Sequence, residues 1–262
     1  TSNSLQVDFL NDYDVDACLW VGGLGIAGTN AVTDILAGKV NPSGSLVDIY
    51  CYDNLSSPAM HNFIALDYAN YDGQVPDQAA SYMVYQEGIY VGHKYYETRY
   101  FDAVMGQGNA GNYAEQYGKE VAFTFGHGLS YTSFGYENAQ VTQDEDGFTF
   151  SFDLTNTGEM DGAEVVQLYA ADPVATVTKP EKALIAFKKV FLAAGETQRV
   201  SFTVTARDLA YYNVSLREWV TEEGVYTLMA GASSRDIRLT ADILCNAPMP
   251  YTMTPTGETM LG

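Results

Sequence analysis

A glycine-rich segment near the N-terminus has the spacing of a dinucleotide-binding site. Gly23, Gly25 and Gly28 form a G-x-G-x-x-G pattern, and Asp48 follows about twenty residues later. In such sites the glycines let the backbone approach a pyrophosphate, and the acidic residue binds the ribose hydroxyls. Taken alone, this spacing indicates nucleotide binding.

The surrounding sequence favours a different interpretation. The apolar run 15–21 predicts a strand buried in a parallel sheet. Thr29 can cap a following helix and Gly38 can end it. Residues 45–50 predict a second strand, which completes one βαβ unit. Asp48 then lies in mid-strand rather than at a strand end, and a tight turn explains the glycines without a ligand. We therefore keep nucleotide binding as the minor alternative.

Other side chains with catalytic potential are scattered along the chain. Glu87 lies in the tyrosine-rich segment 85–100 and could act as an acid or base, but we favour a role in ordering that segment. The three histidines, which we expect to be structural, have no partner carboxylate at motif spacing: His61, His93 and His127. Trp20 and the tyrosines could stack on a sugar ring, although core packing is the favoured interpretation.

The cysteines and the charge narrow the class of protein. Cys18, Cys51 and Cys245 are too few and too scattered for a disulfide framework or a zinc site. A net charge of −20 disfavours nucleic acid and anionic membranes as partners, and it is compatible with a neutral substrate such as a sugar. The sequence has no apolar run of membrane-spanning length and no signal-peptide pattern. We expect a soluble protein, bacterial cytoplasmic or secreted, whose true N-terminus lies upstream of Thr1.

The remaining sequence divides into a loop-rich stretch and a region of alternating polarity. Residues 41–44, Asn-Pro-Ser-Gly, predict a turn in which Asn41 bonds its own backbone. Residues 102–119 are rich in Gly, Asn and Gln and predict a surface loop. From residue 135 the hydrophobic period becomes two, which predicts an all-β immunoglobulin-like sandwich. Six segments alternate between apolar and polar residues or have the apolar composition of buried strands. They are 148–154, 166–170, 184–192, 200–204, 226–230 and 237–241.

Four segments together resemble the C-terminal portion of glycoside hydrolase family 3, the β-glucosidase and β-xylosidase family. They are LWVGGLGIAGTNAVTDILAGKVNPSGSLVDIY, EGIYVGHKYYETRY, FTFGHGLSYTSF and the pair NTGEMDGAEVVQLYAADP and LIAFKKVFLAAGE. The resemblance implies a partial α/β sandwich domain over 1–134, a fibronectin type III-like β-sandwich over 135–245, and a linker or tail over 246–262. The tyrosine-rich segment and the Pro-containing tail also resemble a subgroup in which a (β/α)8 barrel follows the fibronectin-like domain.

The resemblance implies a function that this chain serves only in part. Such enzymes are retaining hydrolases of β-linked glucosides or xylosides and use two carboxylates. The nucleophile Asp belongs to the barrel, and the acid/base Glu is expected upstream of residue 15. Both are therefore expected outside this chain, and no catalytic, cofactor-binding or metal-binding residue is assigned within it. The expected partners are the oligosaccharide substrate, the barrel and the upstream half of the α/β domain. A carbohydrate- or protein-binding module without catalysis is the main alternative.

Overall fold

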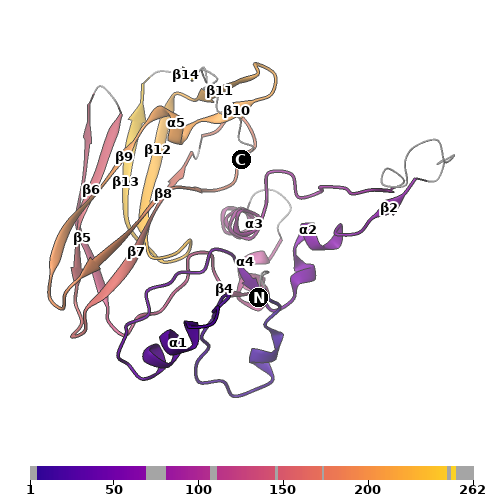
Figure 1. The fold of residues 1–262 in the computed structure, drawn as a ribbon. Helices are drawn as coiled ribbons and strands as arrows, with labels where there is room; N and C mark the ends of the chain where they lie inside the picture. Colours follow the sequence, from indigo (N-terminus) through magenta and orange to yellow (C-terminus); the bar gives the residue numbers. More distant parts are fainter. Residues whose placement is uncertain are drawn as a thin grey trace. The chain divides into compact units, whose positions relative to one another are not determined.

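The structure is a computed structural model that describes residues 5–68, 81–106, 111–144, 147–172, 174–246 and 249–251. The chain forms two compact units (Figure 1). The first unit comprises residues 1–40 and 45–128, and the second comprises residues 41–44 and 129–262. Among the described residues, no helix combines the length and the apolar character needed to cross a membrane.

Short helices make up most of the regular structure in the first unit. They are η1 (Asp8–Asn11), α1 (Gly28–Leu36), η2 (Asn54–Ser56), α2 (Pro58–His61), α3 (His93–Met105) and α4 (Tyr113–Glu120). The prediction that Thr29 caps α1 is wrong, because the helix begins one residue earlier and Ala27 occupies the cap position. The Thr29 carbonyl instead accepts a hydrogen bond from the Thr33 hydroxyl at 3.0 Å. Gly38 follows the helix with φ 71°, as its position predicts.

The two parallel strands predicted around α1 are not formed. Residues 15–21 belong to no described strand, and of residues 45–50 only Tyr50 does, in β1 (Tyr50–Cys51). Strand β1 pairs antiparallel with β4 (Val121–Phe123). A buried strand needs neighbours that bond its backbone groups, and within the described residues the first segment has none in a sheet. The general class, an α/β part followed by a sandwich, holds without this βαβ unit.

Helix α4 corrects the prediction of a surface loop over residues 102–119. Residues 102–105 belong to α3, and α4 begins at Tyr113. Tyr113 and Tyr117 lie one helical turn apart and are both buried, in a core that also contains Tyr96. The burial of these two rings outweighs the loop-like composition of the segment.

The second unit is a sandwich of two antiparallel sheets that share one core (Figure 1). One sheet has the strand order β13-β12-β7-β8 and the other has the order β5-β6-β9. Their strands are β5 (Phe134–Gln143), β6 (Phe148–Asn156), β7 (Gly162–Ala171), β8 (Ala183–Leu192), β9 (Thr197–Val204), β12 (Gly224–Gly231) and β13 (Ile237–Cys245). All six segments predicted as strands are therefore confirmed.

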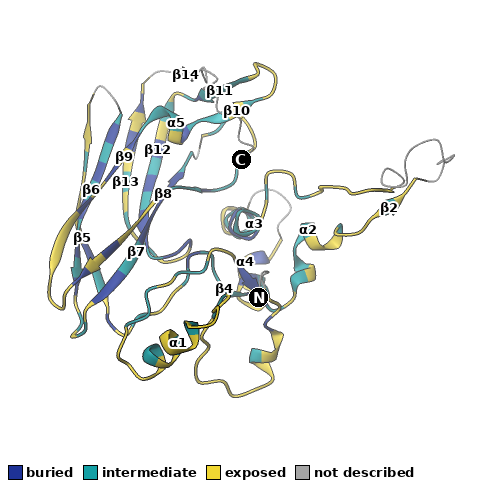
Figure 2. Cartoon of the chain, viewed as in Figure 1, coloured by how far each residue is buried: buried dark blue, intermediate teal, exposed yellow. Residues whose placement is uncertain are grey.

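Strand β6 shows why the sequence predicted this sandwich. Phe148, Phe150, Phe152 and Leu154 are all buried, and the residues between them are less so. Figure 2 colours the strands of the sandwich by burial. This alternation is the burial pattern of a strand with one face on the core. The inward residues of β6, β7 and β12 belong to one continuous hydrophobic cluster.

Smaller elements complete both units. In the second unit, α5 (Ala206–Leu209) precedes a small sheet of the order β10-β11-β14. Its strands are β10 (Tyr211–Asn213), β11 (Glu218–Thr221) and β14 (Met249–Tyr251). Strand β14 falls within the predicted tail 246–262, most of which lies outside the described residues. In the first unit, β2 (Leu66–Asp67) pairs with β3 (Ser81–Tyr82).

Candidate functional site

Residues from the glycine-rich segment, the tyrosine-rich segment and the segment 123–134 lie close together at the start of α3 in the first unit. A Cβ atom placed on Gly92, which precedes the helix with φ 58°, would lie 3.7 Å from Oδ1 of Asp48. The ring of His93, the first helical residue, stacks on Phe125 with centroids 4.2 Å apart. His127 stacks in the same way on Phe123, at 5.4 Å. Each of the two histidine rings therefore packs against a phenylalanine ring.

Backbone hydrogen bonds hold the motif residues in this arrangement. The N–H of Leu46 donates to the carbonyl of His127 at 2.8 Å, and the N–H of Gly126 donates to the carbonyl of Leu46 at 2.9 Å. Gly126 has φ 82°, a conformation that favours glycine. The Gly-His-Gly segment, residues 126–128, thus lies at a tight turn that is hydrogen-bonded to the chain before β1.

Asp48 has a local role in this arrangement. Its Oδ1 accepts the backbone N–H of Ile49 at 2.8 Å, and the same oxygen lies beside Gly92, the N-cap of α3. A carboxylate near a helix N-terminus is favoured by the helix dipole. A local hydrogen bond and the nearby helix N-terminus therefore account for Asp48 without a ribose.

The glycine segment does not have the context that nucleotide binding requires. That site needs a strand directly before the glycines, and residues 15–21 form none. Gly25 has φ 60° in a turn, and a Cβ on Gly28 would lie 2.9 Å from Cβ of Leu24. A tight turn into α1 explains both glycines.

Glu87 lies in a turn before α3, and its side chain is half-buried. Its backbone carbonyl accepts the N–H of Tyr90 at 2.9 Å. This backbone hydrogen bond belongs to the turn that precedes α3. An ordering role for the Glu87 side chain stays a prediction.

Several tyrosines pack between α3 and α4 and reach carboxylates that the sequence did not single out. The hydroxyl of Tyr117 donates to Oε1 of buried Glu97 at 2.8 Å, and that of Tyr113 donates to Oε2 of Glu120 at 2.9 Å. The guanidinium of Arg99 lies 3.9 Å from the centroid of the Tyr113 ring. Burial is the main cause that raises the pKa of Tyr113, so this hydroxyl stays protonated. These rings serve packing, whereas Trp20 is 48% exposed and remains open to sugar stacking.

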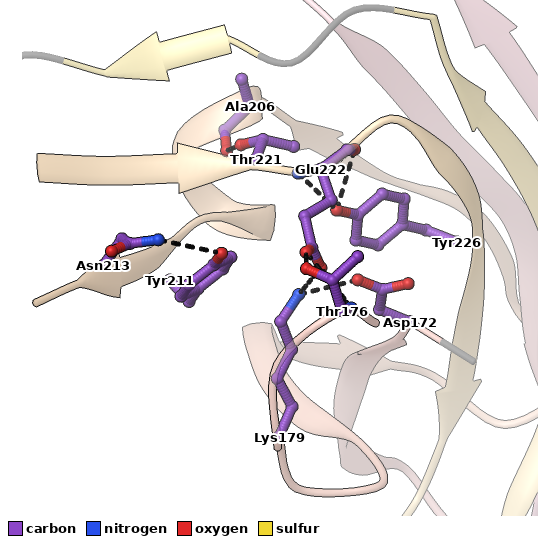
Figure 3. Close-up of polar contacts among 9 residues, drawn as sticks. All are labelled: Asp172, Thr176, Lys179, Ala206, Tyr211, Asn213, Thr221, Glu222 and Tyr226. Carbon is purple, nitrogen blue, oxygen red and sulfur yellow. Dashed lines mark hydrogen bonds and ion pairs between the residues drawn. The ribbon is translucent and has the colours of Figure 1, made fainter. Parts of the chain in front are cut away.

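The second unit contains a polar cluster built around Lys179 (Figure 3). Its Nζ lies 2.7 Å from Oδ2 of Asp172 and 2.8 Å from Oε2 of Glu222, and it sits 4.5 Å from the centroid of the Tyr211 ring. Glu222 also accepts hydrogen bonds from the hydroxyl and the N–H of Thr176. All three ion-pair side chains are largely buried.

Asp172 and Glu222 share Lys179 as an ion-pair partner, which favours the ionised form of Glu222. Burial alone would raise the pKa of Glu222, yet hydrogen bonds from Lys179 and Thr176 outweigh it and hold the pKa below its usual value. A general acid needs a raised pKa at this position. The cluster instead ties Thr176 and Lys179, which lie between β7 and β8, to Glu222 in the turn before β12.

Replacing Lys179 by Met should lower the free energy of unfolding at pH 7 by about 2–4 kcal/mol, because two largely buried carboxylates lose their shared partner. A depressed Glu222 pKa gives stability that is present above the ordinary value and is lost as pH falls through the folded value. The loss of unfolding free energy in the Lys179→Met variant should therefore become smaller below about pH 4. Urea unfolding at pH 7 and pH 3.5 measures it.

The matched control is Lys39→Met, which breaks the exposed pair between Lys39 and Asp34. That change should cost less than about 1 kcal/mol at either pH. A Lys179→Met deficit that stays the same at both pH values would contradict the assigned role of Glu222.

Within the described ranges, no group of three or more His, Cys, Asp and Glu side chains is placed to hold a metal ion. The geometry therefore offers two packed motif clusters and one ion-pair clamp.

Comparison with known proteins identifies both units. Residues 1–93 match the glycosyl hydrolase family 3 C-terminal domain, and residues 164–234 match the fibronectin type III-like domain. The chain is 35% identical over 232 residues to thermostable β-glucosidase B of Acetivibrio thermocellus, covering 87% of this chain and 26% of that protein. It is 34% identical over 221 residues to an exo-α-(1→6)-L-arabinopyranosidase of Bifidobacterium breve, covering 84% and 25%.

A solved structure gives the same result. β-Glucosidase 3B of Thermotoga neapolitana, solved in complex with α-D-glucose, superposes with a TM-score of 0.66 and 33% identity, covering 84% of this chain and 27% of that one. The fold and the two domain types define the class: a C-terminal portion of a glycoside hydrolase. The chain belongs to glycoside hydrolase family 3. It spans about a quarter of the length of the curated relatives it matches.

Proposed function

We propose that this chain is the accessory part of a retaining β-glucosidase that removes terminal β-linked glucose from oligosaccharides or glucosides. The observation that carries the proposal is the match of 84–87% of the chain, across both units, to glycosidases more than three times its length. In this proposal residues 1–134 belong to the α/β domain, residues 135–245 form the fibronectin-like domain and residues 246–262 form a linker or tail. The enzyme acts in the bacterial cytoplasm or after secretion.

The surface of the first unit supports a larger assembly. Helix α1 has an apolar stripe (Ala31, Val32, Ile35 and Leu36), but none of its residues is buried. Leu36 in this stripe is 71% exposed, and Ile26 and Val47, which lie outside the helix, are 104% and 86% exposed. Amphipathic helices gain most of their stability when a partner covers the apolar face. We assign that partner to the upstream half of the α/β domain, and both catalytic carboxylates to the parts outside this chain.

Hydrolysis of an aryl β-glucoside tests the proposal. The 262-residue chain alone should show no turnover, because a retaining mechanism needs two carboxylates across the glycosidic bond. A longer polypeptide that includes the barrel and the upstream segment should release β-glucose first, as seen by NMR. Aryl β-xyloside and aryl α-L-arabinopyranoside, assayed in parallel, define the sugar preference.

Two outcomes would overturn this proposal. The first is turnover by the 262-residue chain alone. The second is a folded longer polypeptide that hydrolyses none of the three substrates.

A further inference from the structure

The turn Asn41-Pro42-Ser43-Gly44 belongs to the second unit, although the residues on both sides of it belong to the first. The chain leaves the first unit after Val40, contributes these four residues to the sandwich unit, and returns at Ser45. The sequence predicted that Asn41 would bond its own backbone, and that prediction is wrong. The partners of its side chain lie 89 to 120 residues away.

Asn41 uses both ends of its amide in these contacts. Its Oδ1 accepts hydrogen bonds from Oγ of Ser130 and from the N–H of Tyr131, each at 2.8 Å. Its Nδ2 donates to the carbonyl of Asp161 at 3.0 Å. The side chain thus connects the segment before β5 with the turn before β7.

Two glycines leave the space that this arrangement needs. A Cβ on Gly162 would lie 2.7 Å from Nδ2 of Asn41 and 2.8 Å from Cγ2 of Thr132. A Cβ on Gly158 would overlap Oγ1 of Thr132. The glycines of the Asn-Thr-Gly-Glu-Met-Asp-Gly segment therefore keep this site open for Asn41 and Thr132.

The contacts of Asn41 continue into a buried network. The N–H of Thr132 donates to Oγ of Ser130 at 3.3 Å, and Oγ1 of Thr132 donates to Oδ1 of Asn156 at 2.6 Å. Asn156 is 0% exposed and donates to the carbonyls of Met160 and Leu192. Asn41 is therefore one end of a hydrogen-bond chain that reaches the sandwich interior.

We propose that the turn 41–44 is a latch that makes the stability of the sandwich unit depend on a segment held covalently at both ends by the first unit. The fibronectin-like domain is then not autonomous. With the latch seated, the two units unfold in one cooperative transition, and without it they separate. This inference concerns folding and does not rest on the proposed activity.

The chain contains two tryptophans, which allows the units to be followed separately. In a Trp20→Phe background, Trp219 fluorescence reports the sandwich unit, and circular dichroism at 222 nm reports helices α1 to α4 of the first unit. The parent should show coincident melting midpoints. Asn41→Ala should lower the Trp219 midpoint by about 5–10 °C, since three hydrogen bonds are lost, and should separate the two transitions.

Lys39→Ala is the matched control, two residues away in the first unit and limited to an exposed ion pair. It should move either midpoint by less than about 2 °C. The proposal is overturned if Asn41→Ala moves the Trp219 midpoint no more than this control does. It is also overturned if the two melting midpoints of the parent already differ. Ser130→Ala removes one of the three bonds and should give a smaller shift, which keeps the test valid if Asn41→Ala fails to fold.

A double-mutant cycle tests the contact between Asn41 and Gly162. Gly162→Ala should lower the Trp219 midpoint in the parent, because the new methyl group meets Asn41. In the Asn41→Ala background its additional effect should be smaller, although the contact with Thr132 remains. Fully additive shifts would place Asn41 away from Gly162 and would contradict the latch.

Discussion

Asn156→Ala is expected to lower the free energy of unfolding of the sandwich unit by about 3–5 kcal/mol. The side chain makes four hydrogen bonds and is 0% exposed. Each bond contributes about 1 kcal/mol, and each buried group left without a partner costs a further 1–3 kcal/mol unless the site relaxes. Urea unfolding followed by Trp219 fluorescence in the Trp20→Phe background measures the change.

Asn213→Ala is the control for this prediction. The Oδ1 of Asn213 accepts the N–H groups of Ser215 and Leu216 in an exposed turn. Water can replace these bonds, so the loss should be about 1 kcal/mol or less. Equal losses for the two asparagines would show that burial of the Asn156 network contributes nothing.

Phe152→Ala should also cost about 3–5 kcal/mol. The ring is 0% exposed and stacks on Tyr136 with centroids 5.4 Å apart. Truncation removes this contact and leaves a cavity between two sheets that cannot collapse freely. The same urea experiment measures the loss.

Thr149→Ala tests the other face of the same strand. Thr149 lies on β6 between two inward phenylalanines, and its side chain points away from the core. Its replacement should change stability by less than about 0.5 kcal/mol. A loss close to that of Phe152→Ala would mean that the assignment of inner and outer faces is wrong.

The sandwich could be predicted from sequence because its signal is local. The alternation along β6 is visible within nine residues, and it needs no knowledge of the partner strands. The helix over Tyr113–Glu120 was missed because its composition resembled a loop. The spacing of Tyr113 and Tyr117 was the available signal, since residues one helical turn apart share a face.

The failed predictions depend on distant partners. Residues 15–21 have the composition of a buried strand, but a strand forms only when neighbouring strands bond its backbone. The partners of Asn41 are 89 or more residues away, and no local rule points to them. The ion pair between Lys179 and Glu222 also joins residues separated by 43 positions. Family resemblance identified the domains, but it did not reveal these contacts.

The uncovered apolar stripe of α1 has a colloidal consequence. At pH 7 a net charge of −20 keeps copies of the chain apart, although Leu36 is largely exposed. The isoelectric point is about 4.2, so this repulsion disappears in mild acid while the apolar stripe stays exposed. We expect copies of the chain to associate through the stripe under these conditions. Neutral, low-salt buffers are therefore the conditions in which this chain stays dispersed.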